Sequence, residues 1–323
     1  MAKNILSHAL TSFGQEVQQG LSAFPKYLSS KYFYDAIGDK LFQDIMAMPE
    51  YYLTQAEFDI LEAQAADIAA HFAPQKTVFS LFELGAGDGK KTKILLRHLV
   101  NHGYDFDYRP IDISQNALDN LQSNIAQELP GVSVNPLQGS YFETLKTIGA
   151  TTERRKVILF LGSNIGNLLH RDAISFLQQL NQAMNDDDLL LMGMDQKKNP
   201  QTVLSAYNDP AGITEAFNKN VLTRINRELD GNFDLEKFKH WEVYDPETGT
   251  AKSYLVAKEA HKVYLGALDL EVRFEAWETI HTEISQKYDD QVVSWLTREA
   301  GFEIQEAFTD AKKSFKDYIL KKQ

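Results

Sequence analysis

The stretch LFELGAGDGKKT, residues 81–92, constrains the fold more than any other part of the chain. A mostly apolar run over residues 77–84 predicts a strand that leads into three alternate glycines, Gly85, Gly87 and Gly89. Residues 91–99 predict a helix that begins inside the glycine loop. Glycines let the backbone take positive φ and approach a ligand closely, while the start of a helix presents free N–H groups. This strand, turn and helix therefore predict a nucleotide-like ligand.

Strands and helices alternate on both sides of this loop. The pattern predicts a helix at 58–72 before the loop and, after it, a strand ending at Asp112, a helix at 115–128, a strand in KVILFLGS, a helix at 171–184 and a strand in DLLLMGMD. Strands this uniformly apolar leave no face for water. The sequence therefore predicts an α/β fold in which helices cover both faces of a parallel sheet.

The pattern changes after Asp195. Residues 199–233 predict helices, residues 241–265 predict antiparallel strands around a turn at 246–249, and residues 268–288 predict a further strand and a loop. The final segment predicts a helix and two strands that return to the first sheet, with its lysines at the end of an edge strand. We therefore expect a core of residues 58–195 and 288–323, and a second α+β lobe of residues 1–57 and 196–287.

The loop favours S-adenosylmethionine over a dinucleotide. The dinucleotide pattern G-x-G-x-x-G requires a glycine where Lys90 stands, and a pyrophosphate would be repelled by Glu83 and Asp88. The sulfonium and ammonium groups of S-adenosylmethionine instead match an acid such as Glu83 at this edge. Asp112 ends the next strand, where a carboxylate accepts from ribose hydroxyls. The pattern E-x-G-x-G-x-G is typical of class I (Rossmann-like) methyltransferases, although NAD binding or a tight turn without a ligand remain alternatives.

Composition excludes several other classes of function. The formal net charge of −12 argues against nucleic acid and anionic membranes as partners, and DPPY and NPPY strings are absent. Without cysteine there is no thiolate nucleophile, and the scattered histidines lack H-E-x-x-H, so we expect no metal. No apolar run is long enough to span a bilayer, and no cleavable leader is evident at the N-terminus. We expect a cytoplasmic monomer that acts on a small molecule.

Five segments of the chain together resemble one family in particular. They are PKYLSSKYFYDAIGDKLFQDIMAMPEYYLTQAE, ELGAGDGKKT, FLGSNIGN, YNDPAGITEAFNKNVLTRINRELDGNFD and LDLEVRFEAWETIHTEIS. In this order, and along nearly the whole chain, they are similar to the histidine-specific, S-adenosylmethionine-dependent methyltransferases. Those enzymes make Nα,Nα,Nα-trimethylhistidine (hercynine) for ergothioneine. A generic methyltransferase has neither the tyrosine-rich entry segment nor the inserted lobe.

The resemblance implies roles for individual residues at the acceptor amino acid. It places Tyr51 and Asn167 beside the acceptor amine, Tyr207 and Ser285 on or near its carboxylate, and Glu283 and Tyr34 at the imidazole. A carboxylate such as Glu283 gives an imidazole N–H a charge-assisted partner. Ser253 stands near the imidazole where family members commonly have methionine. The smaller side chain leaves other aromatic amino acids open as acceptors.

The resemblance also implies the residues that hold the cofactor. They are Gly85, Lys91, Asp112 and Gly162, with Ser140 and Tyr141 at the adenine, in addition to Glu83 and Gly87 of the loop pattern. Family members commonly have an acid where Ser140 stands, so the adenine amino group lacks its expected acceptor. Tyr141 or Phe142 would stack on the adenine, although either aromatic equally fits an ordinary core position.

The chain is thus expected to be an L-histidine Nα-methyltransferase whose acceptor sits between the two lobes. Methyl transfer requires a deprotonated amine aligned with the sulfonium in a dry site. Tyr51, or water relayed past Asn167, is a candidate base. Alternatives are a methyltransferase for another aromatic amino acid or small amine, an NAD-dependent dehydrogenase, and a non-catalytic sensor of S-adenosylmethionine or another nucleotide.

Overall fold

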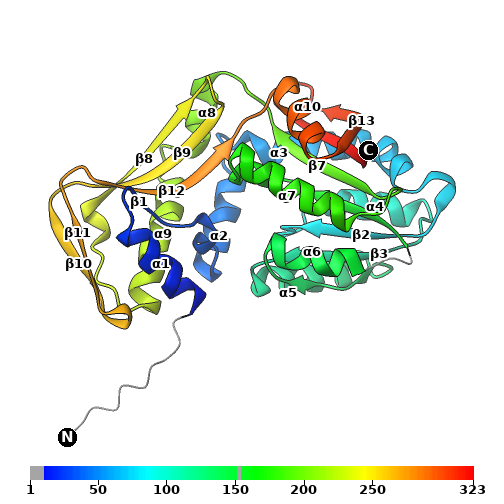
Figure 1. Ribbon diagram of the computed structural model, residues 1–323. Helices are drawn as coiled ribbons and strands as arrows, with labels where there is room; N and C mark the ends of the chain where they lie inside the picture. Colours follow the sequence, from blue (N-terminus) through cyan, green and yellow to red (C-terminus); the bar gives the residue numbers. More distant parts are fainter. Residues whose placement is uncertain (1–10, 151–153) are drawn as a thin grey trace, which may run out of the picture. The chain divides into compact units, whose positions relative to one another are not determined.

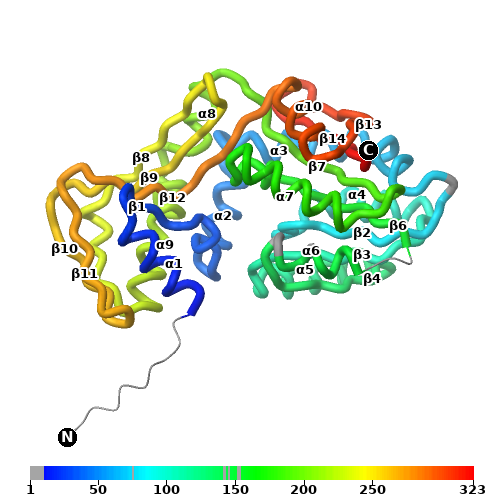
Figure 2. The backbone as a smooth tube through the Cα atoms, viewed as in Figure 1, coloured from blue at the N-terminus to red at the C-terminus, as the bar shows by residue number. Residues whose placement is uncertain are grey.

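A computed structural model of the protein describes residues 11–150 and 154–323. The chain divides into two compact units, which are described separately below. The core unit comprises Met46–Val203, Asp245–Ala251 and Ile284–Gln323. The lobe unit comprises Met1–Ile45, Leu204–Tyr244 and Lys252–Glu283. Figures 1 and 2 trace the elements of both units along the chain.

An eight-stranded sheet forms the centre of the core unit. Its strands are β2 (Phe79–Leu84), β3 (Phe106–Asp112), β4 (Ser133–Val134), β5 (Leu137–Gln138), β6 (Arg155–Phe160), β7 (Leu189–Asp195), β13 (Phe302–Thr309) and β14 (Phe315–Lys322). The order across the sheet is β13-β14-β7-β6-β2-β3-β4, with β5 also paired to β3. All neighbours from β7 to β4 are parallel, whereas β14 is antiparallel to both β7 and β13.

Helices cover both faces of this sheet, as the uniformly apolar strands predict. Leu159 and Leu191 pack on the face covered by α3 (Tyr52–Phe72), α4 (Thr92–Asn101) and α5 (Gln115–Glu128). Ile158 and Leu190, the alternate residues of the same strands, pack on the face covered by α6 (Tyr141–Ala150), α7 (His170–Ala183) and α10 (Asp290–Glu299). Short 3-10 helices, η2 (Pro74–Lys76) and η3 (Asn164–Asn167), lie in the connections.

The architecture confirms the predicted class I methyltransferase core. Helix α5 spans the predicted residues because Ser114 accepts from the Ala117 backbone N–H at 3.2 Å and caps its start. The C-terminal helix and two strands return to the first sheet, where Figure 2 shows the red strands β13 and β14 beside β7. One expectation was wrong. The terminal lysines belong to β14, which lies between β13 and β7, so they do not end an edge strand.

The lobe unit is built on a smaller sheet. Its helices are α1 (Ser12–Ser22), η1 (Ser30–Phe33), α2 (Ala36–Met46), α8 (Pro200–Tyr207), α9 (Ile213–Glu228), η4 (Leu235–Lys237) and η5 (Gly266–Leu268), of which α2 and α8 reach the core unit. The sheet has the order β1-β12-β9-β8, from β1 (Lys26–Tyr27), β12 (Thr279–Gln286), β9 (Thr250–Ala257) and β8 (Phe238–Asp245). A separate hairpin pairs β10 (His261–Leu265) with β11 (Leu270–Phe274).

Candidate active site

The glycine loop joins β2 to α4 at the carboxyl end of the parallel strands. Gly85, Gly87 and Gly89 all have positive φ, at 73°, 54° and 65°, as their spacing predicts. The Gly85 N–H donates to the Ile111 carbonyl at 2.7 Å and so ties the loop to the end of β3. A Cβ at Gly87 would meet no atom within 4 Å. The backbone at Gly87 therefore faces open space that a ligand can approach closely.

Asp112 is held at this edge by the loop itself. Its Oδ2 accepts from the Gly87 N–H at 2.9 Å, and its Oδ1 accepts from the Ser114 N–H at 2.9 Å. The side chain is half-buried at the last position of β3. These two bonds fix the Asp112 carboxylate at the edge of the loop. The structure thus brings together Gly87 and Asp112, two of the predicted cofactor residues.

Glu83 lies beneath the loop, and its described contacts are with the protein. Its carboxylate is buried and accepts from the Thr92 and Tyr108 hydroxyls, which come from α4 and β3. Burial raises the pKa of Glu83 to about 7, although both hydroxyls and Lys91 act to lower it. Its predicted role, to neutralise a cationic ligand, remains a prediction. The contacts shown here hold the loop between its two flanking elements.

Lys91 and Gly162, both predicted to hold the cofactor, converge on a residue that sequence reasoning missed. Glu57 of α3 forms an ion pair with Lys91 and accepts from the Gly162 N–H at 2.8 and 2.9 Å. Burial, the largest single effect, acts to lower the pKa of Lys91, but the nearby carboxyls of Glu57, Asp317 and Glu83 together raise it. No local pattern marks Glu57, because its partners lie far away in the sequence.

A second buried acid, Asp317 of β14, lies beside Glu57. A Cβ at Gly193 would fall 2.2 Å from Glu57 Oε1 and 3.0 Å from Asp317 Oδ1, so only glycine leaves room for both carboxyls. Within the described part of the chain, no donor reaches the Asp317 oxygens. Burial and the charge of Glu57 raise the pKa of Asp317 well above its usual range. Both effects favour the neutral form of Asp317, which lies beside the Glu57–Lys91 ion pair.

The loop predicted at the adenine contains an acid that the sequence analysis overlooked. Ser140 donates from its backbone N–H and its hydroxyl to Glu143 Oε2, at 2.8 and 2.6 Å. This is a capping box at the start of α6, and the spacing S-x-x-E in SYFE is its sequence signal. Glu143 thus brings a carboxylate to Ser140, where the family commonly has an acid. The side chains of Tyr141 and Phe142 lie outside the described part of the structure.

A buried charge network lies at the end of β7. The Asp195 carboxylate accepts from the Tyr52 hydroxyl at 2.8 and 3.1 Å and forms ion pairs with Lys198 and Lys287, the latter at 2.9 Å. Lys287 also donates to Ser285 Oγ at 2.8 Å. Burial lowers the pKa of Lys198. Of these residues, the sequence analysis had singled out only Ser285.

Tyr51 and Asn167 lie on segments that contact this network within the core unit. Tyr51 is half-buried and immediately precedes α3, whose first residue is Tyr52. Asn167 is the exposed last residue of η3. The loop before η3 is fixed because Ser163 Oγ accepts from the Asp195 N–H at 3.0 Å. Each predicted acceptor residue of the core unit therefore lies near a contact of Asp195. Tyr51 precedes Tyr52, which binds the Asp195 carboxylate, and Ser285 binds Lys287, which pairs with it. Asn167 ends the short segment that starts at Ser163, which binds the Asp195 N–H.

The lobe unit carries the other four predicted acceptor residues, in separate surroundings. The Tyr34 ring packs edge-on against Phe42 and Phe217, at centroid distances of 5.6 and 5.5 Å. The Tyr207 carbonyl accepts from His240 Nε2 at 2.9 Å. Glu283 is half-buried on β12.

The fourth, Ser253, forms a buried polar pair. Its hydroxyl donates to Glu242 Oε2 at 2.7 Å, between the neighbouring strands β9 and β8. Both side chains are buried. The position for which the resemblance implies methionine is therefore polar in this chain, and Glu242 is a further acid that sequence reasoning missed.

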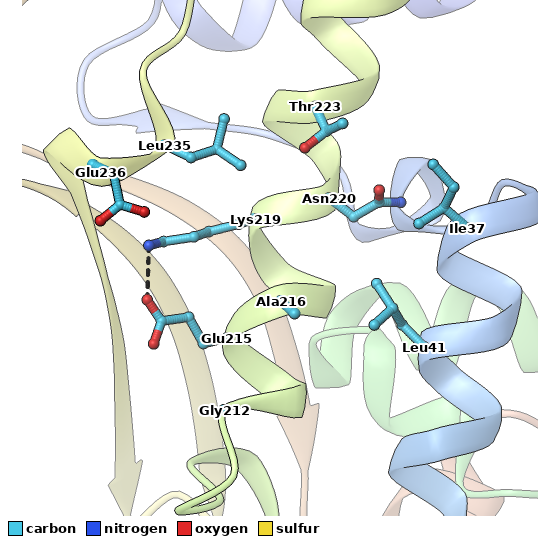
Figure 3. A pocket seen from close by; sticks show the side chains of 10 residues that line it. All are labelled: Ile37, Leu41, Gly212, Glu215, Ala216, Lys219, Asn220, Thr223, Leu235 and Glu236. Atoms are coloured by element: carbon cyan, nitrogen blue, oxygen red, sulfur yellow. Dashed lines mark ion pairs between the residues drawn. The ribbon is translucent and has the colours of Figure 1, made fainter.

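A separate pocket of about 430 Å³ lies in the lobe unit, between α2, α9 and η4 (Figure 3). Within it, Lys219 and Glu215 form an ion pair of 2.7 Å. The walls are Ile37, Leu41, Gly212, Glu215, Ala216, Lys219, Asn220, Thr223, Leu235 and Glu236. None of the residues predicted for cofactor or acceptor is part of this lining.

Two features are absent from residues 11–150 and 154–323. In that part of the chain, no three or more His, Asp or Glu side chains are grouped so that they could hold a metal ion. No helix in the same ranges has the length and apolar character needed to cross a membrane.

Comparison with known proteins places the chain in a family. Residues 13–322 match the family described as histidine-specific methyltransferase, SAM-dependent. The histidine N-alpha-methyltransferase of Mycobacterium tuberculosis (strain CDC 1551 / Oshkosh) is 37% identical over 299 residues, covering 89% of this chain and 91% of that protein. The protein of the same name from Mycolicibacterium smegmatis (strain ATCC 700084 / mc(2)155) is 36% identical and covers 95% and 94%.

A fungal relative extends the comparison. Ergothioneine biosynthesis protein 1 of Schizosaccharomyces pombe (strain 972 / ATCC 24843) is 30% identical over 302 residues, which are 92% of this chain and 39% of that longer protein. The family match spans both the core unit and the lobe unit. This chain therefore belongs to the family of histidine-specific, S-adenosylmethionine-dependent methyltransferases.

Proposed function

We propose that the chain transfers methyl groups from S-adenosylmethionine to the α-amino group of free L-histidine and forms Nα,Nα,Nα-trimethylhistidine (hercynine), a step of ergothioneine biosynthesis. Family membership over residues 13–322 supports the reaction and the cofactor. The single structural observation that carries the proposal is the bond from the Gly87 N–H to Asp112 at 2.9 Å. It places a fixed acceptor beside an open glycine backbone at the carboxyl edge of the sheet.

The residues at this edge fit the cofactor. Asp112 would accept from the two ribose hydroxyls, and Gly87 leaves space for close approach. Lys91 supplies a cation for the carboxylate of the methionine part, and Glu57 keeps it in place beside Gly162. Glu143, held by Ser140, would accept from the adenine amino group. When bound, the cofactor supplies an electrophilic methyl group on a sulfonium.

The resemblance implies acceptor roles for residues of each unit. From the core unit, Tyr51 and Asn167 would orient the amine and Ser285 would bind the carboxylate. From the lobe unit, Tyr207 would assist at the carboxylate, while Tyr34, Ser253 and Glu283 would face the imidazole. By function, we assign residues 58–195 and 288–323 to the catalytic core and residues 1–57 and 196–287 to the substrate-binding lobe. These bounds place Tyr51 and Ser285 in the lobe, whereas the compact units of the structure place both in the core unit.

The residues of the chain contribute mainly alignment and proton transfer. Attack on the methyl carbon requires an amine lone pair in line with the sulfur, so the α-ammonium must first lose its proton. Neutral oxygens such as those of Tyr51 and Asn167 orient the amine without trapping it as an ammonium. Tyr51, or water relayed past Asn167, would accept the proton. Each further methylation, including the last, requires the methylated ammonium to lose a proton in the same way.

The Ser253–Glu242 pair favours histidine over an apolar aromatic acceptor. A hydroxyl bonded to a buried carboxylate keeps this part of the lobe polar. An imidazole could add a hydrogen bond to this pair, whereas an apolar ring would remove water from the pair without offering a hydrogen bond, which costs binding free energy. Tryptophan, phenylalanine, tyrosine and small amines remain the acceptors against which histidine has to be compared.

The direct test is to incubate the purified protein with S-adenosylmethionine and L-histidine and to identify the products by mass spectrometry and NMR. We expect S-adenosylhomocysteine together with histidine that carries up to three methyl groups, all on the α-nitrogen. Methylation on the imidazole ring, or no methylation of histidine, would contradict the proposal. We further propose that the enzyme is a cytoplasmic monomer, which size-exclusion chromatography with light scattering and fractionation of the native cells would test.

A further inference from the structure

Lys287 is a buried lysine for which the fold alone gives no reason. Its side chain is 0% exposed, and its ammonium pairs with Asp195 Oδ2 at 2.9 Å. Burying an ion pair costs several kcal/mol in desolvation, so such a pair is weak evidence of a stabilising role. The same ammonium donates to Ser285 Oγ at 2.8 Å, two residues before it in the chain. The cation therefore acts directly on a hydroxyl of the proposed acceptor site.

Asp195 connects this cation to the rest of the acceptor residues in the core unit. Its carboxylate holds the Tyr52 hydroxyl at 2.8 Å, and its backbone N–H holds Ser163 Oγ at 3.0 Å. Tyr52 follows Tyr51, and Ser163 fixes the loop that ends at Asn167. One residue, Asp195, thus joins three chain segments through its carboxylate and its backbone N–H, and each segment carries a residue proposed to bind the acceptor.

The direction of the Lys287 bond determines what Ser285 can bind. An ammonium has only donors, so the Ser285 oxygen accepts and its own proton is directed to a different partner. A hydroxyl polarised by a cation is a stronger donor, and its best partner is an anionic oxygen. In the proposed reaction, the anionic group of the acceptor is the α-carboxylate.

We propose that Lys287 is a positioning residue that makes the enzyme selective for acceptors with a free α-carboxylate, because it orients the Ser285 hydroxyl toward that group. The inference rests on the proposed function and deepens it. It predicts that Lys287 contributes to the affinity for amino acids but not for the corresponding decarboxylated amines.

A matched control exists in the same unit. Lys156 is also 0% exposed and pairs with Asp188 Oδ2 at 2.9 Å. That pair lies at the beginning of β6, where Asp188 also accepts from the backbone N–H groups of Lys156 and Asn185, both at 2.7 Å. The partners of this pair belong to the backbone around β6 and β7. Lys156 lies at the amino end of β6, whereas the glycine loop follows the carboxyl ends of the strands. Replacing Lys156 therefore reports the effect of losing a buried lysine as such.

The experiment is isothermal titration calorimetry of L-histidine and of histamine, each in the presence of S-adenosylhomocysteine. It compares the parent with Lys287→Met, Ser285→Ala, the double variant and Lys156→Met. We expect Lys287→Met and Ser285→Ala each to weaken histidine binding about tenfold or more, with histamine binding little changed. The double variant should lose no more than either single variant, because both remove one interaction. Lys156→Met should lower the melting temperature but keep the histidine-to-histamine ratio.

The outcomes separate this inference from the proposed function. Equal losses for histidine and histamine, or unchanged histidine affinity, would overturn the role of Lys287. If Lys287→Met does not fold, Lys287→Gln takes its place and is compared in the same way, because Ser285→Ala alone tests the carboxylate contact and not the role of Lys287. If the parent binds another amino acid instead of histidine, the proposed function fails for the acceptor, and the same ratio is measured with that amino acid and its decarboxylated amine.

Discussion

The Tyr108 hydroxyl of β3 donates a hydrogen bond to the buried Glu83 carboxylate of β2, beneath the glycine loop. Thr92, the first residue of α4, donates to the other oxygen of the same carboxylate. Glu83 therefore links two strands and a helix at the place where the chain turns toward the cofactor. These contacts hold the loop through buried side chains of β2, β3 and α4.

The buried position of Glu83 makes the free energy of unfolding depend on pH. Burial raises the pKa of Glu83 to about 7, so the folded protein binds a proton that the unfolded chain releases near its ordinary pKa. The resulting stabilisation is present at low pH and is lost as the pH rises toward and through 7. We expect this group to account for up to about 3 kcal/mol between pH 4.5 and 8. Urea unfolding of the parent and Glu83→Gln across this range measures it, and equal pH slopes would contradict the assignment.

The paired acids Glu57 and Asp317 should respond differently to loss of charge. Asp317→Asn keeps a neutral group and should change the free energy of unfolding by less than about 1 kcal/mol at pH 7. Glu57→Gln removes the anion opposite Lys91 and should cost about 3 kcal/mol or more. Urea denaturation of both variants checks this. Equal costs would show that the proton is not on Asp317.

Asp112→Ala should weaken S-adenosylmethionine binding by about 1–3 kcal/mol, because it removes the acceptor for the ribose hydroxyls and the anchor of the Gly87 N–H. The control is Asp107→Ala, on the same strand but at its amino end, where Asp107 binds Ser80 and Arg109. The control should lower stability without changing cofactor affinity. Calorimetry that finds the parent affinity in Asp112→Ala would remove Asp112 from the site.

Tyr51→Phe should lower turnover about a hundredfold while cofactor affinity stays within about twofold of the parent, because the hydroxyl is proposed to act on the amine. Tyr264→Phe serves as the control, since that hydroxyl bonds only locally to Asp269 at 2.6 Å on the β10–β11 hairpin. Steady-state kinetics and calorimetry separate the two effects. Lost cofactor affinity with turnover preserved at saturation would make Tyr51 a cofactor residue.

The fold was predictable from the sequence where signals were local. Alternating apolar strands and helices revealed the parallel sheet, and the cap at Ser114 marks the start of α5. Strand β12 escaped notice because its residues, TIHTEISQ, are mostly polar and its neighbour β1 lies some 250 residues away. The position of β14 inside the sheet depends on pairing with β7, which a terminal run of lysines does not reveal.

The site was predictable only in part, for the same reason. The glycine spacing identified the loop and Asp112, and the family-like segments identified the acceptor candidates. No local sequence pattern marks the buried charged residues Glu57, Asp317, Asp195 and Lys287. Their contacts are with residues that become neighbours only when the sheet folds. Glu143 differs from these residues, because the local spacing S-x-x-E predicts its hydrogen bond to Ser140.

Glu283→Ala should lower the preference for histidine over tryptophan and phenylalanine about tenfold or more, because it removes the carboxylate proposed to accept from the imidazole N–H. Glu278→Ala is the control, since Glu278 lies just before β12 and pairs with Lys26. Relative kcat/KM values for the three amino acids give the measurement. A variant that keeps the full preference for histidine would show that Glu283 does not bind the imidazole ring.

The central claim is that this enzyme methylates the α-amine of free histidine. A single reaction containing the parent protein, S-adenosylmethionine and equal concentrations of histidine, tryptophan, phenylalanine and tyrosine tests it most directly, with each product followed by mass spectrometry. The account predicts that histidine is consumed first and carries up to three methyl groups. Preferential methylation of another of the four amino acids, with histidine left unmodified, would contradict it.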